Sequence, residues 1–417
     1  MLKNNLKYSI IEGSFFAFMF GLGENYLSAL GVFLGYTALQ ISILSSLPQL
    51  AGAFIQLASN NFAKVFKSMK ALVVFLSLIQ TVMWILLIVI ISSTNNYFIL
   101  LLWSVVYFSV ASAMGPVWIS WIGYLVPKRI RSNYHASRNK IINTLIFASI
   151  LLGGIILKVF ENNMILAFSI MFGIGAIGRL FSSYYLNKKE DAGNTDDGDA
   201  YTYKSIIKSK TKLLFVVYNT LIHFSVMFLG PLFTIYILRT MELSYMVLTL
   251  CMAAWWVGNI SSSKFWGRLG KKKGNLYLLK LSTVSMVVLP ILWISVYYFD
   301  EQGRILISLI INVLAGVTFA GFGLSSFNIV FEISDKKEVV KYSSLINCLK
   351  GVAIFAGSVI AGSIVDSNWI IDFTSKYSFT SIQFSMIIST ILRFFSYLAL
   401  FKFEREYCER NSREISI

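Results

Sequence analysis

The sequence predicts an all-α integral membrane protein with about twelve transmembrane helices in two pseudo-symmetric six-helix bundles. Three observations lead to this fold class. Hydrophobic residues make up 56% of the chain and charged residues 13%, whereas soluble domains carry about 25% charged residues. Apolar runs of roughly 20 residues, the length that crosses the hydrocarbon core, recur along the whole chain. Two parts of the chain also resemble each other at a fixed separation.

The apolar runs give the positions of the expected helices. The first run begins at Tyr8 and is long enough to span the bilayer, and no small-residue cleavage site follows it. We therefore expect a retained helix rather than a cleaved signal peptide. The expected spans lie near residues 8–32, 38–61, 70–92, 97–125, 140–160, 164–187, 213–238, 244–266, 275–298, 304–331, 345–366 and 377–402.

The internal repeat has a separation of 208 residues. Each copy contains an apolar run, a basic loop, and a second apolar run with small residues. Duplicated half-bundles that face each other across a polar path are typical of secondary transporters. The matching residues are Gly115 and Gly323, Tyr134 and Tyr342, Asn139 and Asn347, and Gly154 and Gly362.

The spans and one long polar stretch define the expected domains. An N-terminal six-helix bundle covers residues 1–187, and a C-terminal bundle covers residues 213–402. The stretch 188–212 between them contains acidic residues, two glycines and then a basic run from Lys204. This composition is typical of a flexible linker. Residues 403–417 form a polar tail.

The formal charge of +16 is spread over alternate loops rather than gathered in one patch, which argues against nucleic-acid binding. Because Lys and Arg concentrate on the cytoplasmic side of membrane proteins, both termini and every basic loop are expected in the cytoplasm. There the basic loops meet anionic membrane lipid. We expect an integral protein of the cell (inner or plasma) membrane with no nucleic-acid partner.

Cysteine and histidine are too scattered for a disulfide framework or a metal site. The sequence has no G-x-x-x-x-G-K-S/T loop for ATP, and no cluster of catalytic side chains falls at membrane depth. We therefore expect no enzyme activity, no cofactor and no bound metal. The cysteines are Cys251, Cys348 and Cys408, and the histidines are His135 and His223.

Ionisable residues deep in a span are candidates for function, because burying charge in lipid is costly. Glu24 and His223 are the candidates for taking up a coupling proton, since burial raises a carboxylate pKa and histidine titrates near neutrality. The alternatives are a hydrogen-bonded or interfacial Glu24, and a neutral His223 satisfied by a neighbouring helix. For Glu12, near the cytoplasmic end of the first span, the favoured alternative is a structural ion pair.

Polar and aromatic residues at mid-depth are the candidates for substrate binding. Each has a simpler alternative, because interhelical hydrogen bonds and packing also use such side chains. Asn219 lies four residues before His223, so both project from one helix face. The candidates are Gln49, Tyr107, Asn219, Trp256, Asn259 and Asn312.

The segment from Gly267 to Gly274 reads G-R-L-G-K-K-K-G and resembles the loop signature G-x-L-a-D-R/K-x-G of the major facilitator superfamily. Gly267, Leu269, Lys272 and Gly274 match it, and Lys271 replaces the acidic residue. The resemblance covers nearly the whole chain, with twelve spans, a six-plus-six repeat and a long central loop. It implies that these four matching residues belong to a gating loop. It also implies that the first, second, fourth, fifth, seventh, eighth, tenth and eleventh spans line the cavity.

A second basic loop, which contains Pro127 and Arg131, resembles the loop that follows the fourth span in this superfamily, and it implies a gating role for Arg131. Proton-coupled drug exporters of the superfamily carry Gly-Pro in the fifth span and an arginine in the fourth. Here Ser149 and Ile150 stand where Gly-Pro would be, and the fourth span has no arginine. A drug exporter is therefore not favoured.

The sequence as a whole predicts a monomeric secondary active transporter that moves a small organic solute by alternating access with proton coupling. The alternatives are a drug/proton efflux antiporter of the same fold, or a non-transporting membrane receptor or scaffold. The scarcity of deep charges argues against highly charged substrates. Arg179, Lys350 and Arg393 would serve an anion if they reached the cavity.

Overall fold

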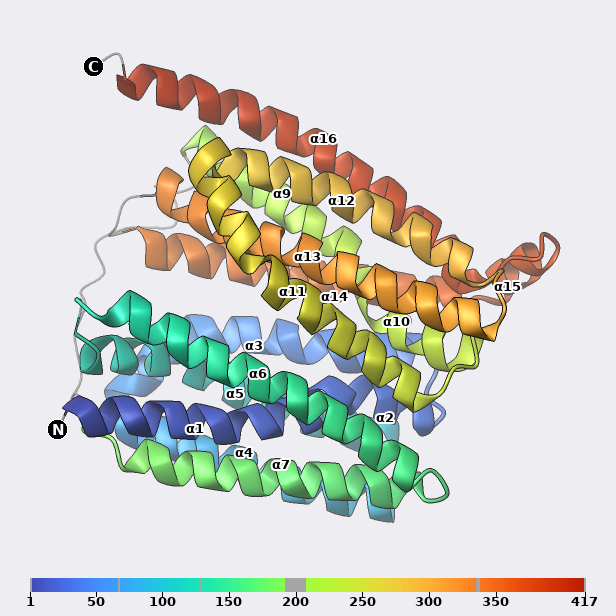
Figure 1. The fold of residues 1–417 in the computed structure, drawn as a ribbon, viewed down its shortest axis with the longest axis horizontal. Coiled ribbons are helices and arrows are strands. Elements are labelled where there is room, and N and C mark those ends of the chain that lie inside the picture. The colour runs from blue at the N-terminus through green and yellow to red at the C-terminus, as the bar shows by residue number, and fades with distance from the viewer. Residues whose placement is uncertain (1, 67, 128, 192–207, 335–337, 416–417) are drawn as a thin grey trace. The chain divides into compact units, whose positions relative to one another are not determined.

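The computed structural model describes residues 2–66, 68–127, 129–191, 208–334 and 338–415. All regular elements in these ranges are helices, and twelve of the described helical segments are long and apolar enough to cross a membrane. The predicted fold class is therefore confirmed (Figure 1). The helices are α1 Leu2–Leu22, η1 Glu24–Tyr26, α2 Leu27–Phe33, α3 Ala38–Phe66, α4 Met69–Ser93, α5 Tyr97–Leu125, α6 Arg131–Val159, α7 Met164–Asn187, α9 Lys210–Met227, α10 Gly230–Ile235, η2 Tyr236–Thr240, α11 Tyr245–Lys273, α12 Asn275–Val296, α13 Glu301–Ile333, α14 Val339–Val365, α15 Asn368–Ser375 and α16 Ser381–Ile415.

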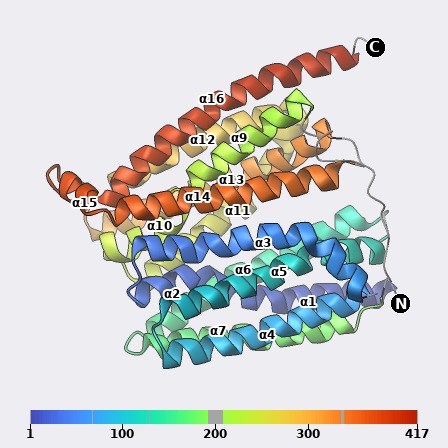
Figure 2. The same cartoon turned by 180° about the vertical axis from the view of Figure 1, so that it is seen from behind.

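The chain divides into two compact units, one of residues Met1–Tyr36 and Leu47–Asp197, the other of Thr37–Ser46 and Gly198–Ile417. In the first unit, α1 packs on α6 and α7, and α4 packs on α5 and α7 (Figure 2). In the second unit, α9 packs on α14 and α16, and α12 packs on α13 and α16. The same four pairings occur in both units, as the predicted duplication requires. The expected linker at 188–212 stays a prediction, because residues 192–207 lie outside the described residues.

The repeated tyrosines make equivalent hydrogen bonds. In the first unit, the Tyr134 hydroxyl donates to the Leu6 carbonyl at 3.1 Å. In the second unit, the Tyr342 hydroxyl donates to the Lys212 carbonyl at 2.9 Å. Each bond joins the first turns of α6 or α14 to the start of α1 or α9. The repeat therefore extends from the sequence to individual contacts.

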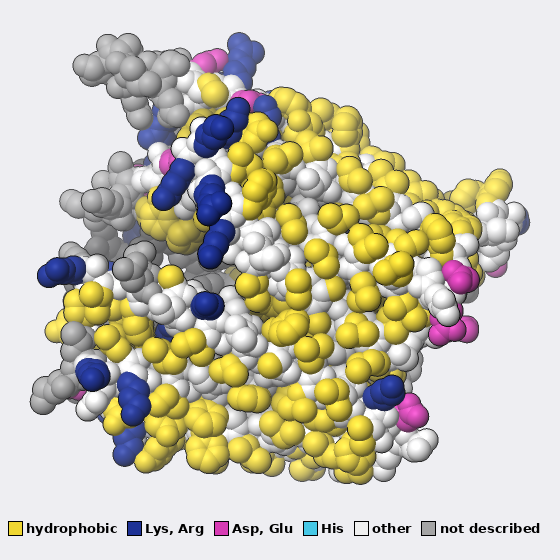
Figure 3. Space-filling view, viewed as in Figure 1, with side chains coloured by type: hydrophobic (Ala, Val, Ile, Leu, Met, Phe, Trp, Pro, Cys, Tyr) yellow, Lys and Arg dark blue, Asp and Glu magenta, His cyan; other side chains and the backbone are white. Residues whose placement is uncertain are grey.

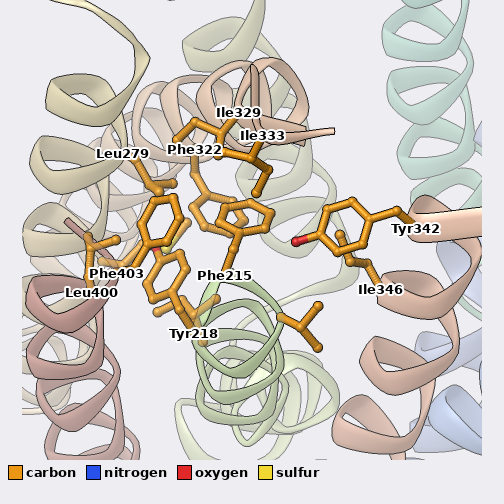
Figure 4. Close-up of a cluster of buried hydrophobic side chains, with 13 residues drawn as sticks. Phe215, Tyr218, Leu279, Phe322, Ile329, Ile333, Tyr342, Ile346, Leu400 and Phe403 are labelled. Carbon is orange, nitrogen blue, oxygen red and sulfur yellow. The ribbon is translucent and has the colours of Figure 1, made fainter. Parts of the chain in front are cut away.

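Each unit has an apolar interior and an apolar outer face. In α4, exposed Phe75, Val82 and Val89 alternate along the helix with buried Trp84 and Leu87, the periodicity of a helix with one face on lipid and one on protein. Figure 3 shows hydrophobic side chains over the middle of the helices, with Lys and Arg gathered towards one end. The interior of the second unit contains aromatic rings from α9, α13, α14 and α16 (Figure 4).

The structure differs from the expected elements in several places. Helix α16 continues to Ile415, through most of the residues 403–417 that were expected to form a polar tail. Helix α6 begins at Arg131 rather than near residue 140, because its polar first turns pack on α1 through Tyr134 and Arg138. A short extra helix, α15, occupies the connection before the last span. Hydropathy reports only the apolar part of a helix, so these features were invisible to a search for apolar runs.

Candidate functional site

The first span is interrupted at Gly23. Helix α1 ends at Leu22, a single 3₁₀ turn follows, and α2 begins at Leu27. Gly23 has φ −101° and ψ −80°, and a Cβ at this position would lie 2.4 Å from the Trp84 ring and 2.6 Å from the Met19 carbonyl oxygen. The close approach of the buried Trp84 ring therefore requires glycine at the break.

Glu24 lies directly after this break. The Tyr107 hydroxyl donates a 2.8 Å hydrogen bond to Glu24 Oε1. Tyr107 is fully buried and its ring stacks on Trp103 and meets Trp84 edge-on, with centroids 5.1 Å apart in both pairs. The structure thus brings together a predicted proton-coupling residue and a predicted substrate residue that are 83 positions apart in the chain.

Arg179 of α7 is the cation of this region. Its side chain is almost fully buried, and its charge acts on Glu24. The guanidinium donates to Ser182 Oγ at 3.2 Å and to Met114 Sδ at 3.1 Å. Within the described residues, Arg179 Nε has no hydrogen-bond partner. Glu24, Tyr107 and Arg179 therefore form a polar group inside the first unit, held by aromatic rings.

The seventh span is interrupted at the corresponding place. Helix α9 ends at Met227, and α10 begins at Gly230 with Pro231 in its first turn. Pro231 lacks a backbone N–H and cannot continue the hydrogen bonding of the preceding helix, which explains the interruption. Gly23 and Gly230 are 207 residues apart, one fewer than the repeat separation, so the two breaks fall at corresponding places in the duplicated spans. Helix breaks in corresponding spans of two repeats are the best general indicator of a transporter's binding region, because they leave backbone groups for ligands.

His223 and Asn219 share one face of α9, as predicted. His223 Nδ1 lies 2.8 Å from the Asn219 carbonyl oxygen, so Nδ1 carries the proton and Nε2 is the acceptor. Asn219 Nδ2 donates to Ser326 Oγ at 3.1 Å. Asn219 Oδ1 is buried without a hydrogen-bond partner in the described part of the chain. The His223 ring lies 5.6 Å from that of Phe322.

The remaining substrate candidates are not gathered with these groups. Gln49 is exposed, and Trp256 is half-buried against the edge of Trp255. Asn259 Nδ2 of α11 lies 3.5 Å from the Gly316 carbonyl oxygen of α13. Asn312 Nδ2 donates at 2.8 Å to a carbonyl one turn back on its own helix, which agrees with the packing alternative. The binding roles of all four remain predictions.

The expected gating loop after the eighth span is shorter than the sequence suggested. Gly267, Leu269 and Lys272 belong to the last turns of α11, and only Gly274 interrupts the helices, with φ +82°. This left-handed conformation explains the glycine, because other residues are strained there. The side chain of Arg131 binds the carbonyls of Gly123 and Val126 at the end of α5. Gly274 thus makes a turn between two helices, and Arg131 caps the end of α5. The gating roles of these residues remain predictions.

Sequence reasoning missed the break at Gly23 and the contact of Trp84 with it. It also missed the approach of Lys350, on α14, to His223 on α9, whose ring lies within range of the lysine charge. The signal available for Lys350 was a single lysine in the middle of an apolar run. The signal available for Gly23 was a glycine beside an intramembrane glutamate.

Comparisons with known proteins agree with the fold. The family model described as Major Facilitator Superfamily matches residues 13–358. A crystal structure of a mutant of the nucleoside transporter NupG is similar with a TM-score of 0.77 and 13% identity, covering 96% of this chain and 100% of that one. An auto-inhibited POT family peptide transporter gives a TM-score of 0.76 and 11% identity, with 96% of each chain covered. A bacterial homologue of the human lysosomal transporter Spinster gives a TM-score of 0.71 and 11% identity, with 97% of each chain covered. At these identities the likeness concerns the fold alone. No curated protein sequence matches the chain.

Proposed function

The chain belongs to the major facilitator superfamily, and from this premise we propose that it is a secondary active transporter that moves a small organic solute by alternating access. The fold is that of secondary transporters, and the twelve apolar helical segments of the described residues make it an integral membrane protein. We further propose that transport is coupled to protons, that the protein works as a monomer in the cell membrane, and that both termini are cytoplasmic.

The pairing of Glu24 with Tyr107 beside the break in the first span is the observation that carries the proposal. Among the carboxylates of the described spans, Glu12 and Glu24 lie furthest inside, each nine residues from an end of the span Lys3–Phe33. Glu12 is held in an ion pair, whereas Glu24 has no ion pair within the described residues. The Glu24 carboxylate accepts one side-chain hydrogen bond, from the Tyr107 hydroxyl. The positive charge of buried Arg179 attracts the carboxylate electrostatically. A carboxylate in this setting takes up or releases a proton when a nearby helix break rearranges. His223 is the second candidate for coupling, because its Nε2 is a free acceptor among the described residues.

The experiment is transport by the full-length protein in vesicles that carry an internal pH-sensitive dye. Solutes that cause proton movement identify substrates. Glu24→Gln should abolish accumulation driven by a proton gradient while solute exchange continues, because exchange does not require release of the proton. Glu161→Gln is the matched control, since Glu161 is exposed and should leave accumulation unchanged.

Two results would contradict the proposal. Gradient-driven uptake that survives in Glu24→Gln removes Glu24 from the coupling mechanism. A second measurement tests alternating access itself, with single cysteines placed at Gln49 and Asn219 in a variant lacking the native cysteines. If labelling at both positions came permanently from one side of the membrane, with or without substrate, the receptor or scaffold alternative would be favoured.

A further inference from the structure

Lys350 lies near the middle of a membrane span. It is the tenth residue of the span Lys341–Val365, about 4–5 Å from the middle residue at 1.5 Å per residue. Its helix, α14, packs on α9, which carries His223 and Asn219. Lys350 and His223 therefore stand on two helices that pack against each other inside the second unit.

The ammonium of Lys350 has no counter-charge among the residues that the structure describes. No hydrogen bond or ion pair joins Lys350 Nζ to any residue that the structure describes, and the side chain is half-buried. The carboxylates in the described spans of the second unit stand near the span ends. These residues are Glu301, Glu332, Glu404, Glu406 and Glu409. A charge within a span normally pairs with another group or serves a pathway, and the described part of the chain supplies no partner for this one.

Packing does not explain the lysine. At the repeat separation of 208 residues, Lys350 corresponds to Ile142 of α6. Ile142 is buried and its Cδ1 fills the space beside Gly13 of α1. At the same separation His223 corresponds to Phe15 of α1, and the nearest titratable side chain there, Glu12, is ion-paired with Arg138. The first unit therefore builds the same helix pair with apolar residues at the places where the second unit has a lysine and a histidine.

We propose that Lys350 binds an anionic group, a carboxylate or a phosphate, on the transported solute. Two acceptors stand on the neighbouring helix α9, namely His223 Nε2 and the unpartnered Asn219 Oδ1. They suit a hydroxyl or amine donor on the same solute. This inference rests on the proposed transport function and names its substrate class as a small organic anion with a neighbouring donor group. Arg393 is less suited, because its guanidinium is buried and bound to the Met286 carbonyl at 2.7 Å.

The test uses thermal-shift measurements on the detergent-purified full chain with probe pairs that differ in charge. The pairs are lactate with lactamide, and glucose 6-phosphate with glucose, and inorganic phosphate and choline are added singly. Wild-type protein should be stabilised by at least one anionic probe and not by its neutral partner. Lys350→Ile should weaken that binding about tenfold or more, as expected for loss of a charged hydrogen bond.

Three controls make the result decisive. Lys350→Ile places at this position the residue that the first unit already accommodates, so it should fold with unchanged or higher stability. Lys350→Arg keeps the charge and should retain the preference for anions. Lys376→Ile removes an exposed lysine from the same unit and should leave probe binding unchanged.

Several outcomes would overturn the proposal. These are stabilisation by neutral or cationic probes alone, an anion response that survives in Lys350→Ile, and no response to any anionic probe. The cysteine-labelling measurement separates this failure from failure of the transport proposal. If labelling still alternates between the two sides while anions have no effect, the chain is a transporter of other solutes and only the role of Lys350 is wrong.

Discussion

Glu12 and Arg138 form a buried ion pair in the first unit, with Oε1 of Glu12 3.1 Å from Nη2 of Arg138. Lys189 Nζ approaches the same oxygen at 3.4 Å, and the guanidinium lies over the Trp118 ring at 4.7 Å. Burial lowers the pKa of Lys189, and the neighbouring Glu12 charge opposes that shift. The cluster ties α1, α6 and the segment after α7 together, which favours the structural alternative for Glu12.

We expect Glu12→Gln to destabilise the protein by about 3 kcal/mol, because it leaves two buried cations without a carboxylate. The melting temperature in detergent measures this loss. Glu301→Gln, at an exposed helix end, should change it little. An unchanged melting temperature for Glu12→Gln would show that the cluster contributes no net stability.

Gly23→Ala should destabilise the protein by about 1–3 kcal/mol, the usual cost of overpacking. The added methyl group would overlap the Trp84 ring at the break between α1 and η1. Gly115→Ala is the matched control, since a Cβ there meets no atom within 4 Å. Adding Trp84→Phe to Gly23→Ala should recover part of the loss. Equal melting temperatures for Gly23→Ala and Gly115→Ala would contradict the tight contact.

Gly274→Ala and Gly267→Ala should behave differently although both residues match the family loop signature. Gly274 has φ +82°, and alanine there costs about 1 kcal/mol of backbone strain. Gly267 lies in a helix with open space around it, so alanine there should be neutral or slightly stabilising. Urea or thermal unfolding of the purified proteins measures whether Gly274→Ala is less stable than Gly267→Ala. A destabilising Gly267→Ala would point to a contact outside the single chain.

Arg131→Gln should cost about 1 kcal/mol, because the carbonyls of Gly123 and Val126 at the end of α5 lose their donor. Arg129→Gln is the control, since Arg129 is an exposed residue of the same loop. Hydrogen exchange at the last turn of α5 gives the measurement. Faster exchange should appear only in Arg131→Gln, and equal exchange in both variants would exclude the cap.

Structural features that depend on local composition could be predicted from the sequence. The twelve spans followed from the length of the apolar runs. Contacts between distant segments were not accessible in the same way. Nothing local joins Glu24 to Tyr107, and the preference of Arg131 for the end of α5 depends on how the connection turns. The role of Gly23 was hidden because it depends on the position of the Trp84 ring.

The paired tyrosine contacts also affect how the two halves can diverge. Tyr134 and Tyr342 each donate to a main-chain oxygen, which every amino acid provides. The acceptor residue can therefore vary both in its side chain and in its exact position, because Leu6 and Lys212 are 206 residues apart, two fewer than the repeat separation. The donor position is more restricted, since its side chain must carry a donor group of the right length to reach that oxygen. Drift after duplication is thus permitted on one side of the contact and restricted on the other.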